Sequence, residues 1–287
     1  MPNILTEDQQ AAYESDGFVL VRGFFDSEEA QLLQAAIVQD PAIRDHFYDR
    51  TDSEGLATKM ATWNHPGDSI YGYAARSRKM VDTMEHLLGG EVYHYHSKIT
   101  AKEPHEGGAW EWHQDYGYWY NNGCLFPQMA SAMIALDKCT KANGCLQVLK
   151  GSHHMGRIDH GLLDGDQVGA DLNRVKQAEK QLELVYCEME MGDVVFFHCN
   201  TLHRSDQNRS DDRRWTLICC YNAASNDPYL EHHHPRYTPL EKVDDVEIKK
   251  AGLKFSDASH QGAFLQQSVN PATLTEKVGD VFTGQDE

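Results

Sequence analysis

The sequence predicts a mainly β fold, a double-stranded β-helix or jelly-roll sandwich flanked by N-terminal helices. From residue 91 onward, the 287-residue chain consists of short runs that alternate in polarity or are rich in β-branched residues. Gly, Asn and Asp turns separate these runs, whereas the helical patterns come earlier in the chain. Helices gathered beside many short strands are typical of an antiparallel sandwich or barrel, of which the double-sheet jelly roll is the common form.

Two helices and one strand are expected near the N-terminus. Thr6 followed three residues later by Gln9 forms a capping-box pattern, which predicts a helix to about Ser15. The apolar run 18–21 then predicts a strand. A second capping-box pattern predicts a helix that continues through residues 28–38.

The next two segments differ in their periodicity. Residues 40–75 mix Pro, Gly, Asp and scattered aromatics without a period, so we expect mostly loop there. Residues 78–88 carry apolar side chains at helical spacing, which predicts a helix ended by Gly89 and Gly90.

Seven strands are expected in the remaining chain. Each is a short alternating or apolar run bounded by turn-forming residues. Their ranges are 92–99, 109–116, 131–136, 145–149, 182–188, 193–198 and 215–222. Residues 176–184 are charged and fit either a short helix or a solvated loop.

No signal divides the chain into two domains. The turn-rich stretches 121–123 and 205–212 are short and flanked by apolar runs, so they are interpreted as loops inside a domain. We therefore expect one domain over residues 1–265. Residues 266–287 are polar and rich in Thr, Gly and Asp, which predicts a frayed tail.

Charge and composition exclude several classes of partner. A formal net charge of −18 repels phosphate backbones and anionic headgroups, so neither nucleic acid nor membrane is an expected partner. The first residues lack a signal-peptide pattern, and no stretch approaches the roughly 18–20 apolar residues that span a bilayer. Seven cysteines without a Cys-x-x-Cys pair indicate a reduced compartment. We expect a soluble cytoplasmic protein that acts on a small molecule; the oligomeric state is not predicted.

The strongest chemical signal is the pair His113 and Asp115, two residues apart in a strand-like run. Side chains at i and i+2 of a strand point to the same face, so an imidazole and a carboxylate would share one cavity. One more imidazole completes a 2-His-1-carboxylate triad that leaves open positions on iron. His203, just after the predicted strand 193–198, is the candidate; its rival His198 lies within that apolar strand, which favours a core position.

A carboxylate-binding group is expected close to these ligands. Arg214 opens the predicted strand 215–222, and a fixed guanidinium there would bind the distal carboxylate of a cosubstrate bidentately. Ser205 would add a hydroxyl to the same contact. The alternative interpretation is that Arg213 and Arg214 are surface charges.

Four segments of the chain occur in a fixed order: Leu5-Thr-Glu-Asp-Gln with Asp16-Gly-Phe-Val-Leu-Val-Arg-Gly-Phe-Phe, Trp112-His-Gln-Asp, Asn143-Gly-Cys-Leu-Gln-Val-Leu-Lys-Gly-Ser-His, and Gly192-Asp-Val-Val-Phe-Phe-His-Cys-Asn-Thr-Leu-His-Arg-Ser. Over most of the chain they resemble the phytanoyl-CoA dioxygenase family, a group of iron(II)- and 2-oxoglutarate-dependent oxygenases that includes ectoine hydroxylase. The resemblance implies Fe(2+), 2-oxoglutarate and dioxygen as cofactor and cosubstrates. One departure is Lys150, where the family usually has Pro before Gly-Ser-His.

The resemblance also implies roles for individual residues. It selects His203 as the distal iron ligand, because the family's histidine precedes one residue and then Ser, and it gives Arg214 and Ser205 to the distal carboxylate of 2-oxoglutarate. The strand 94–102 is similar to one that contacts the cosubstrate, which places His96, Lys98 and Thr100 near the keto acid. Trp119 resembles an aromatic residue that lines the substrate pocket.

The substrate is expected to be a compact zwitterion, such as an ectoine-like amino acid or an aminophosphonate. The aromatic residues 116–120 adjoin the iron ligands, and the rings of Tyr116, Tyr118 and Trp119 would cage an ammonium by cation–π attraction, unless they only pack the core. Arg157, with His160 and Lys98, would meet an anionic group. An acyl-CoA or lipid-like substrate is the alternative, although the phosphates of an acyl-CoA would require a basic surface, and this chain is acidic.

Two other classes stay open at this point. A zinc hydrolase uses the same ligand types, and a non-catalytic metal-binding relative would retain them, but neither needs the arginine. The triplet His232, His233 and His234 precedes Pro235, and a solvated loop is favoured there over a second metal site. The expected chemistry is hydroxylation of an unactivated C–H bond, with no general base beyond the metal centre.

Overall fold

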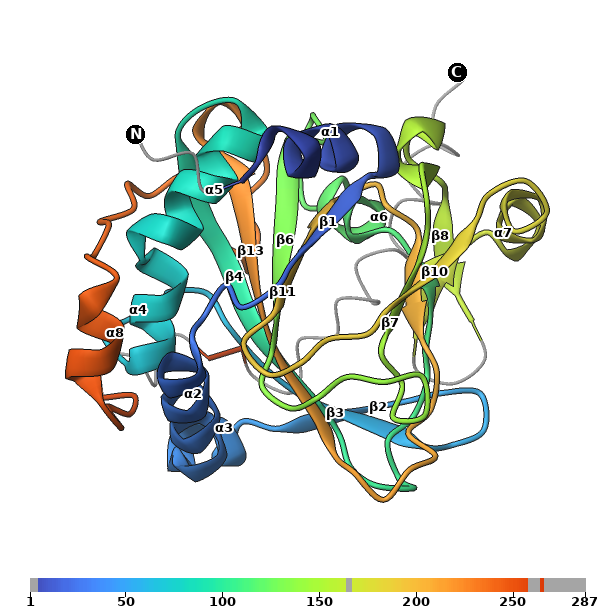
Figure 1. Ribbon diagram of the computed structural model, residues 1–287. Coiled ribbons are helices and arrows are strands. Elements are labelled where there is room, and N and C mark those ends of the chain that lie inside the picture. Colours follow the sequence, from blue (N-terminus) through green and yellow to red (C-terminus); the bar gives the residue numbers. More distant parts are fainter. Residues whose placement is uncertain (1–4, 164–166, 258–263, 266–287) are drawn as a thin grey trace.

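Two antiparallel sheets face each other across the centre of the protein, and helices cover the outer face of the larger sheet (Figure 1). The computed structural model describes residues 5–163, 167–257 and 264–265. The predicted fold class is confirmed, since most of the described elements are antiparallel strands arranged as a sandwich. A single domain over residues 1–265 stays a prediction, and the predicted tail 266–287 lies outside the described residues.

The N-terminal elements follow from their capping residues. Helix α1 (Glu7–Asp16) begins at Thr6 with the predicted capping box and ends at Gly17, whose φ of 83° is left-handed. Strand β1 (Phe18–Val21) and helix α2 (Ser27–Gln39) are also where the patterns placed them. Helix α5 (Arg78–Leu88) matches its predicted range to the residue.

The expected loop over residues 40–75 is wrong, because this segment folds into four short elements: α3 (Pro41–Asp45), β2 (Tyr48–Thr51), β3 (Ala57–Trp63) and α4 (Ile70–Arg76). None is longer than seven residues, so none repeats often enough to show a period. β3 is held by its neighbours in the sheet rather than by a local pattern, since it pairs with β2 on one side and β4 on the other.

The major sheet has seven strands in the order β1-β11-β6-β13-β4-β3-β2. Besides β1, β2 and β3, its members are β4 (Val92–Lys102), β6 (Met129–Ala135), β11 (Val194–His198) and β13 (Arg214–Ala223). The minor sheet has the order β10-β7-β12-β5, with β10 (Leu184–Cys187), β7 (Leu146–Leu149), β12 (His203–Ser205) and β5 (Trp110–His113). All seven predicted strands are present with shifted ends.

The remaining elements were not expected or were placed differently. The predicted strand 109–116 ends at His113, and helix α6 (Asp115–Trp119) follows at once. The charged stretch 176–184 contributes only the end of helix α7 (Leu172–Ala178) and the first residue of β10. The described residues also form β8 (His160–Leu162), β9 (Val168–Ala170), α8 (Val246–Ala251) and the 3-10 helices Ser152–Met155 and Ala224–Asn226.

Alternation along β11 divides the core between the two faces of the major sheet. Val194 and Phe196 pack in the cluster that includes α2, α4 and α5, whereas Val195 and Phe197 pack in the cluster that includes the minor sheet. A strand with apolar residues on both faces appears in sequence as a continuous apolar run.

An irregularity in β4 decides which of its side chains face the minor sheet. Across from β13, Tyr221 is opposite His94 and Cys220 is opposite His96, so Tyr95 is an extra residue with no partner. Such a bulge re-aims the side chains that follow it. Beyond the bulge, Ile99 packs with the helices, and the even-numbered residues from His96 to Lys102 face the space between the sheets.

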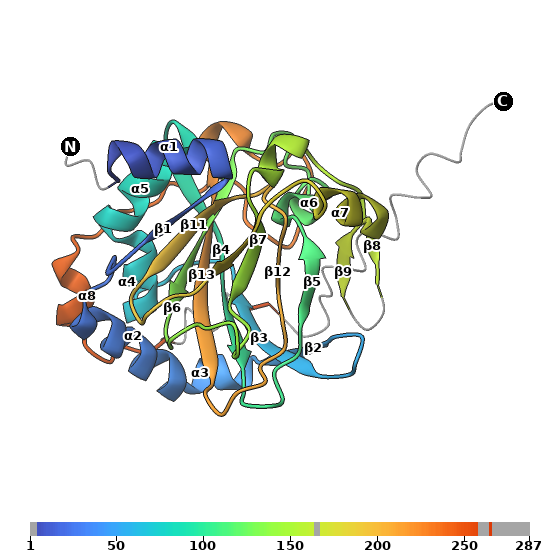
Figure 2. The ribbon, with the colours of Figure 1, turned by 45° about the vertical axis from the view of Figure 1, so that its right-hand side comes forward.

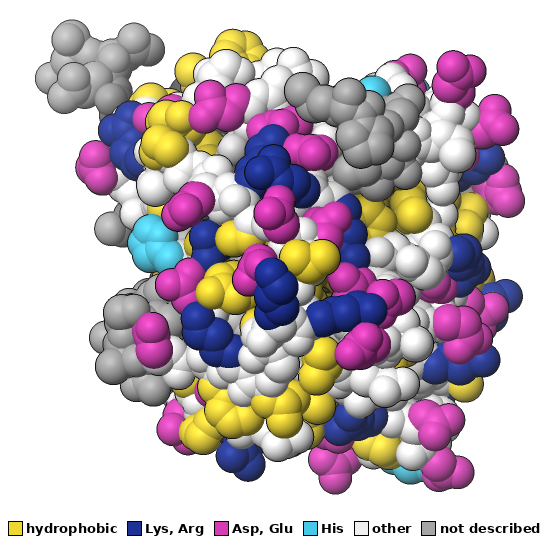
Figure 3. All heavy atoms as spheres, turned by 60° about the vertical axis from the view of Figure 1, so that its left-hand side comes forward, with side chains coloured by type: hydrophobic (Ala, Val, Ile, Leu, Met, Phe, Trp, Pro, Cys, Tyr) yellow, Lys and Arg dark blue, Asp and Glu magenta, His cyan; other side chains and the backbone are white. Residues whose placement is uncertain are grey.

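The surface over the helices carries charges of both signs side by side (Figure 3). Ion pairs account for part of this mixture, for example Lys249 with Asp26 at 2.7 Å and Lys242 with Glu85 at 2.6 Å. No helix in the described residues is both long and apolar enough to cross a membrane.

Phe196 should be a main contributor to stability because it is fully buried between the major sheet and the helices. Phe196→Ala is expected to lower the free energy of unfolding by about 3–5 kcal/mol, measured by chemical denaturation. Phe126→Ala is the matched control, since Phe126 is 55% exposed, and should change it little. Equal losses in the two variants would contradict this account of the core.

Candidate metal centre

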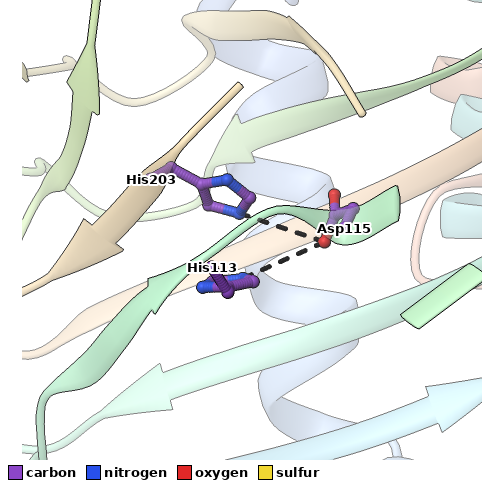
Figure 4. Close-up of side chains that lie close together, drawn as sticks. All are labelled: His113, Asp115 and His203. Carbon is purple, nitrogen blue, oxygen red and sulfur yellow. Dashed lines mark ion pairs between the residues drawn. The ribbon is translucent and has the colours of Figure 1, made fainter. Parts of the chain in front are cut away.

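Two imidazoles and a carboxylate converge between the sheets (Figure 4). His113 ends β5, Asp115 begins α6, and His203 begins β12. One ligand atom from each lies within 4.8 Å of the others, and the Nε2 atoms of both histidines are 3.9 Å from Asp115 Oδ1. All three side chains are buried. No other group of this kind occurs in the described parts of the chain.

The pairing of β12 with β5 explains the distal histidine. His203 lies directly opposite His113 in this antiparallel pair, so residues 90 positions apart become neighbours (Figure 2). The sequence patterns predict no strand at His203, just after the predicted strand 193–198, whereas His203 begins a three-residue strand. Such a short strand has no period to reveal it.

The geometry expected for His113 and Asp115 is wrong. His113 and Asp115 do not share one face of a strand, because the strand ends at His113 and Asp115 lies in the first turn of a helix. Gln114 stabilises the turn between them, since its side-chain amide donates to Gly156 O at 2.8 Å and to Asn200 O at 2.7 Å.

Hydrogen bonds set the tautomer of both histidines and the orientation of the Asp115 carboxylate. Nδ1 of His113 lies 2.7 Å from Glu111 O, and Nδ1 of His203 lies 2.8 Å from Thr201 O. These carbonyls can only accept, so each Nδ1 carries the proton and each Nε2 keeps a free lone pair. Asp115 Oδ2 accepts from Ser131 Oγ at 2.9 Å, which leaves Oδ1 for a metal.

The electrostatics favour the neutral imidazoles that a metal requires. Burial, and then the neighbouring His203, holds the pKa of His113 well below its usual value. Burial also lowers the pKa of His203. Two neutral nitrogens and one carboxylate oxygen fit iron(II) in a facial triad, and they also fit zinc. The ligand set alone therefore does not distinguish the two metals, and the residues around it must be considered.

A cavity of about 50 Å³ adjoins the three ligands, and we name it the arginine chamber. Its wall includes polar residues from both sheets and apolar residues. They are Thr100, Lys102, Ser205 and Arg214, and Met133, Phe197 and Ile218.

Arg214 is buried in this wall without a carboxylate. It is 3% exposed, and its Nη1 donates to Thr100 Oγ1 at 3.1 Å and its Nη2 to Gly144 O at 2.8 Å. Its Nε has no partner in the described residues. The surface-charge alternative for Arg214 is therefore wrong. Arg213 is the half-exposed one and pairs with Asp137 at 3.1 Å.

A second buried cation, Lys102, lies directly opposite Arg214 in the pairing of β4 with β13. Lys102 is 1% exposed, and its Nζ donates to Ser205 Oγ at 2.8 Å and Asp206 O at 2.5 Å. Burial, and then the Arg214 charge, lowers the pKa of Lys102 well below its usual value. The charged form of Lys102 is therefore costly beside Arg214, and an anion bound in this chamber would stabilise it.

Of the other residues predicted for the cosubstrate, Thr100, Ser205 and Lys98 line the arginine chamber, and Lys98 Nζ is 4.0 Å from Asp115 Oδ1. His96 is absent from this wall and lines a second cavity. Lys102 was missed, although the alternation of polar residues along β4 pointed to it.

The second cavity has a volume of about 90 Å³, and we name it the histidine chamber. It shares Met60, Lys98, Trp110 and Asp115 with the arginine chamber. Its other wall residues include Arg50, His96, Tyr118, Trp119, His233 and His234. The predicted substrate residues Tyr118 and Trp119 thus lie beside the metal ligands.

Two predicted substrate residues lie elsewhere. Tyr116 points into the core, where its hydroxyl donates to Cys124 O at 3.0 Å, because residues 115–119 form a helix and not a strand. Arg157 lines neither chamber; it pairs with Asp159 at 2.7 Å and lies over the ring of Tyr120.

The favoured interpretation of the histidine triplet as a solvated loop is also wrong. His234 is buried, donates from Nδ1 to Asn64 Oδ1 at 2.9 Å, and stacks on His96 with ring centres 4.5 Å apart. His233 lines the chamber beside it. No local pattern predicts these contacts, because Asn64 and His96 are far from the triplet along the chain.

Comparisons with known proteins agree with this geometry. The chain matches the phytanoyl-CoA dioxygenase (PhyH) family over residues 13–216. It is 33% identical to the L-proline trans-4-hydroxylase of Streptomyces griseoviridis over 181 residues, which are 57% of this chain and 67% of that protein. It is 28% identical to the ectoine dioxygenase of Bordetella parapertussis over 236 residues, 77% of each chain. The crystal structure of EctD from S. alaskensis with 2-oxoglutarate and 5-hydroxyectoine shares the fold, with a TM-score of 0.70, 22% identity and coverage of 85% of this chain and 89% of that one.

Ser131→Ala tests whether the hydroxyl that contacts Asp115 prepares a metal site. Losing this hydrogen bond frees the carboxylate to rotate, so iron(II) affinity should fall by about 10–100-fold in an anaerobic titration against a chelator. Ser225→Ala, at an exposed serine, should bind iron(II) as the unaltered protein does. Unchanged affinity in Ser131→Ala would show that this contact does not orient the ligand.

Proposed function

Because this chain belongs to the phytanoyl-CoA dioxygenase family of iron(II)- and 2-oxoglutarate-dependent oxygenases, we propose that it hydroxylates a C–H bond of a small metabolite at the His113, Asp115 and His203 centre. One observation carries this proposal: the three ligands line the same cavity as Lys102 and Arg214, two buried basic side chains that form no ion pair with a carboxylate of the described residues. When bound, iron and 2-oxoglutarate supply the dioxygen chemistry that inserts the oxygen atom.

The proposed task of the arginine chamber is to hold 2-oxoglutarate by its distal carboxylate. Arg214 and Lys102 supply the charge, and the hydroxyls of Ser205 and Thr100 supply further donors. An anion here relieves the repulsion between the two cations, so cosubstrate binding also stabilises this end of the sandwich.

The chain's other residues orient the ligands and keep water out. The carbonyls of Glu111 and Thr201 fix the proton on Nδ1 of each histidine, and Ser131 fixes the rotation of Asp115. Met133 and Phe197 close the wall with apolar atoms. Between buried side chains of this kind the charge–charge contacts are stronger than they are in water.

A hydrolase with zinc at the same ligands is the weaker candidate. Its chemistry needs an activated water and gives no reason to bury two cations at the end of a cavity. A non-catalytic relative is also disfavoured, because it would retain this unfavourable charge pair without a use for it.

The small volume of the histidine chamber supports a compact substrate over an acyl-CoA. The names of the relatives point the same way, since one acts on L-proline and one on ectoine. We place the protein in the cytoplasm, because all seven cysteines are buried and free. Membranes and nucleic acids are not proposed as partners, given the net charge of −18.

Turnover of 2-oxoglutarate tests the proposed reaction directly. The protein incubated with iron(II), 2-oxoglutarate, oxygen and a panel of small amino acids and aminophosphonates should form succinate, with a gain of one oxygen atom in the responding compound. Replacing iron with zinc should abolish both products. Succinate formed only with CoA thioesters would reject the small-metabolite class, and activity with zinc alone would reject the oxygenase.

Arg214→Gln should lose cosubstrate affinity, because the substitution leaves the distal carboxylate buried with one cation fewer. The dissociation constant of 2-oxoglutarate, measured by calorimetry, should rise on the order of 100-fold or more, as expected for a buried charge pair that loses one partner. Arg213→Gln is the matched control at the neighbouring half-exposed arginine and should leave it within about twofold. A similar rise in both variants would exclude a specific role for Arg214.

A further inference from the structure

Three polar atoms in the wall of the histidine chamber are buried and lack a hydrogen-bond partner in the described residues. They are Nη2 of Arg50, Nδ1 of His96 and Nε2 of His233. A guanidinium always donates, and a neutral imidazole donates from whichever nitrogen carries the proton. In contrast, the Tyr118 hydroxyl in the same wall is already bonded to Val168 O at 2.5 Å. The Arg50 Nη2 can only donate, and each of the two imidazole nitrogens donates in one of its tautomers, so the wall is able to bind a ligand with acceptor atoms.

Arg50 gives the wall a positive charge without a carboxylate of its own. Its Nη1 donates to Asp49 O at 3.1 Å, and its guanidinium carbon lies 4.7 Å from the ring centre of Tyr48. The second cation, Lys98, has Asp115 at 4.0 Å. Asp115 is the sole carboxylate among the described wall residues, and the proposed iron site uses it. The wall thus carries more positive than negative charge, which favours an anion.

The histidines are held in place before any ligand arrives. His96 and His234 stack with ring centres 4.5 Å apart and planes 22° apart, and Asn64 Oδ1 lies 2.9 Å from His234 Nδ1. Burial holds the pKa of both rings well below the usual value, and burial, followed by His232, lowers the pKa of His233 to about 3. Neutral, fixed imidazoles donate N–H groups at little entropic cost on binding.

The position of the chamber relates this donor group to the metal ligands. His96 lines the histidine chamber and Thr100 lines the arginine chamber, and both belong to β4. Four residues of strand separate their backbones by about 13 Å. Lys98 lies between them, next to Asp115. A molecule whose acceptor group contacts His96 therefore needs only a short carbon skeleton to reach the metal ligands.

We propose that Arg50, His96 and His233 bind a compact anionic group of the substrate, a carboxylate or a phosphonate, and so select small anionic or zwitterionic metabolites. This inference rests on the proposed function, because it names the end of the substrate that the histidine chamber recognises. It gives to Arg50 the role that the sequence suggested for Arg157.

Binding of simple anions tests the proposal without turnover. The protein, loaded anaerobically with iron(II) and saturating 2-oxoglutarate, is titrated in a calorimeter with acetate, with methylphosphonate and with uncharged acetamide. At least one anion should bind at a single saturable site, and acetamide should not. Arg50→Gln should weaken that binding about tenfold or more, and Arg50→Lys should retain most of it. Arg78→Gln, at an exposed arginine paired with Asp244, should behave as the unaltered protein does.

The outcomes separate this inference from the proposed function. No saturable anion binding, or equal binding by Arg50→Gln and the unaltered protein, would overturn the inference while the 2-oxoglutarate titration still reports on the arginine chamber. Failure to bind 2-oxoglutarate would overturn the proposed function instead. If Arg50→Gln does not fold, as judged by circular dichroism, His233→Leu is the second variant, and anion affinity that is unaffected by it would also overturn the inference.

Discussion

The antiparallel pairing of β12 with β5 is the contact on which the site depends. It sets His203 opposite His113, and the turn after His113 then brings Asp115 to the same point. The same short strand places Ser205 beside Lys102. Since β12 has only three residues, its position is fixed by pairing on both sides, with β5 and with β7.

Strand β4 distributes the chemistry along the interior. Its bulge at Tyr95 sets the even-numbered side chains toward the minor sheet, so His96 lies in the histidine chamber, Lys98 beside the metal ligands and Lys102 in the arginine chamber. The bulge at Tyr95 therefore directs side chains of one strand into both chambers, which meet at Asp115.

The interior is rich in polar groups that its own neighbours do not satisfy. Arg214 and Lys102 repel each other across paired strands, and Arg50 and His96 retain unused donors. Such arrangements lower the stability of the protein, and the proposed binding of anions would compensate for them. The continuous apolar packing on the helical face of the major sheet, around Phe196, supplies the stability that tolerates this interior.

The sequence by itself determined the elements that carry local signals and the identity of the ligands that carry motifs. Capping boxes defined α1 and α2, and short alternating or apolar runs located seven of the strands. The spacing of His113 and Asp115 singled out one pair of ligands, and the resemblance to the family selected His203 and gave Arg214 its role. Only the tertiary structure decided the elements too short to have a period, the helix at Asp115, and the placement of Lys102, Arg50, His233 and His234 in the cavity walls. The physical reason is that these side chains acquire their environment from strands and loops distant in sequence, so no local pattern records whether they meet solvent or one another.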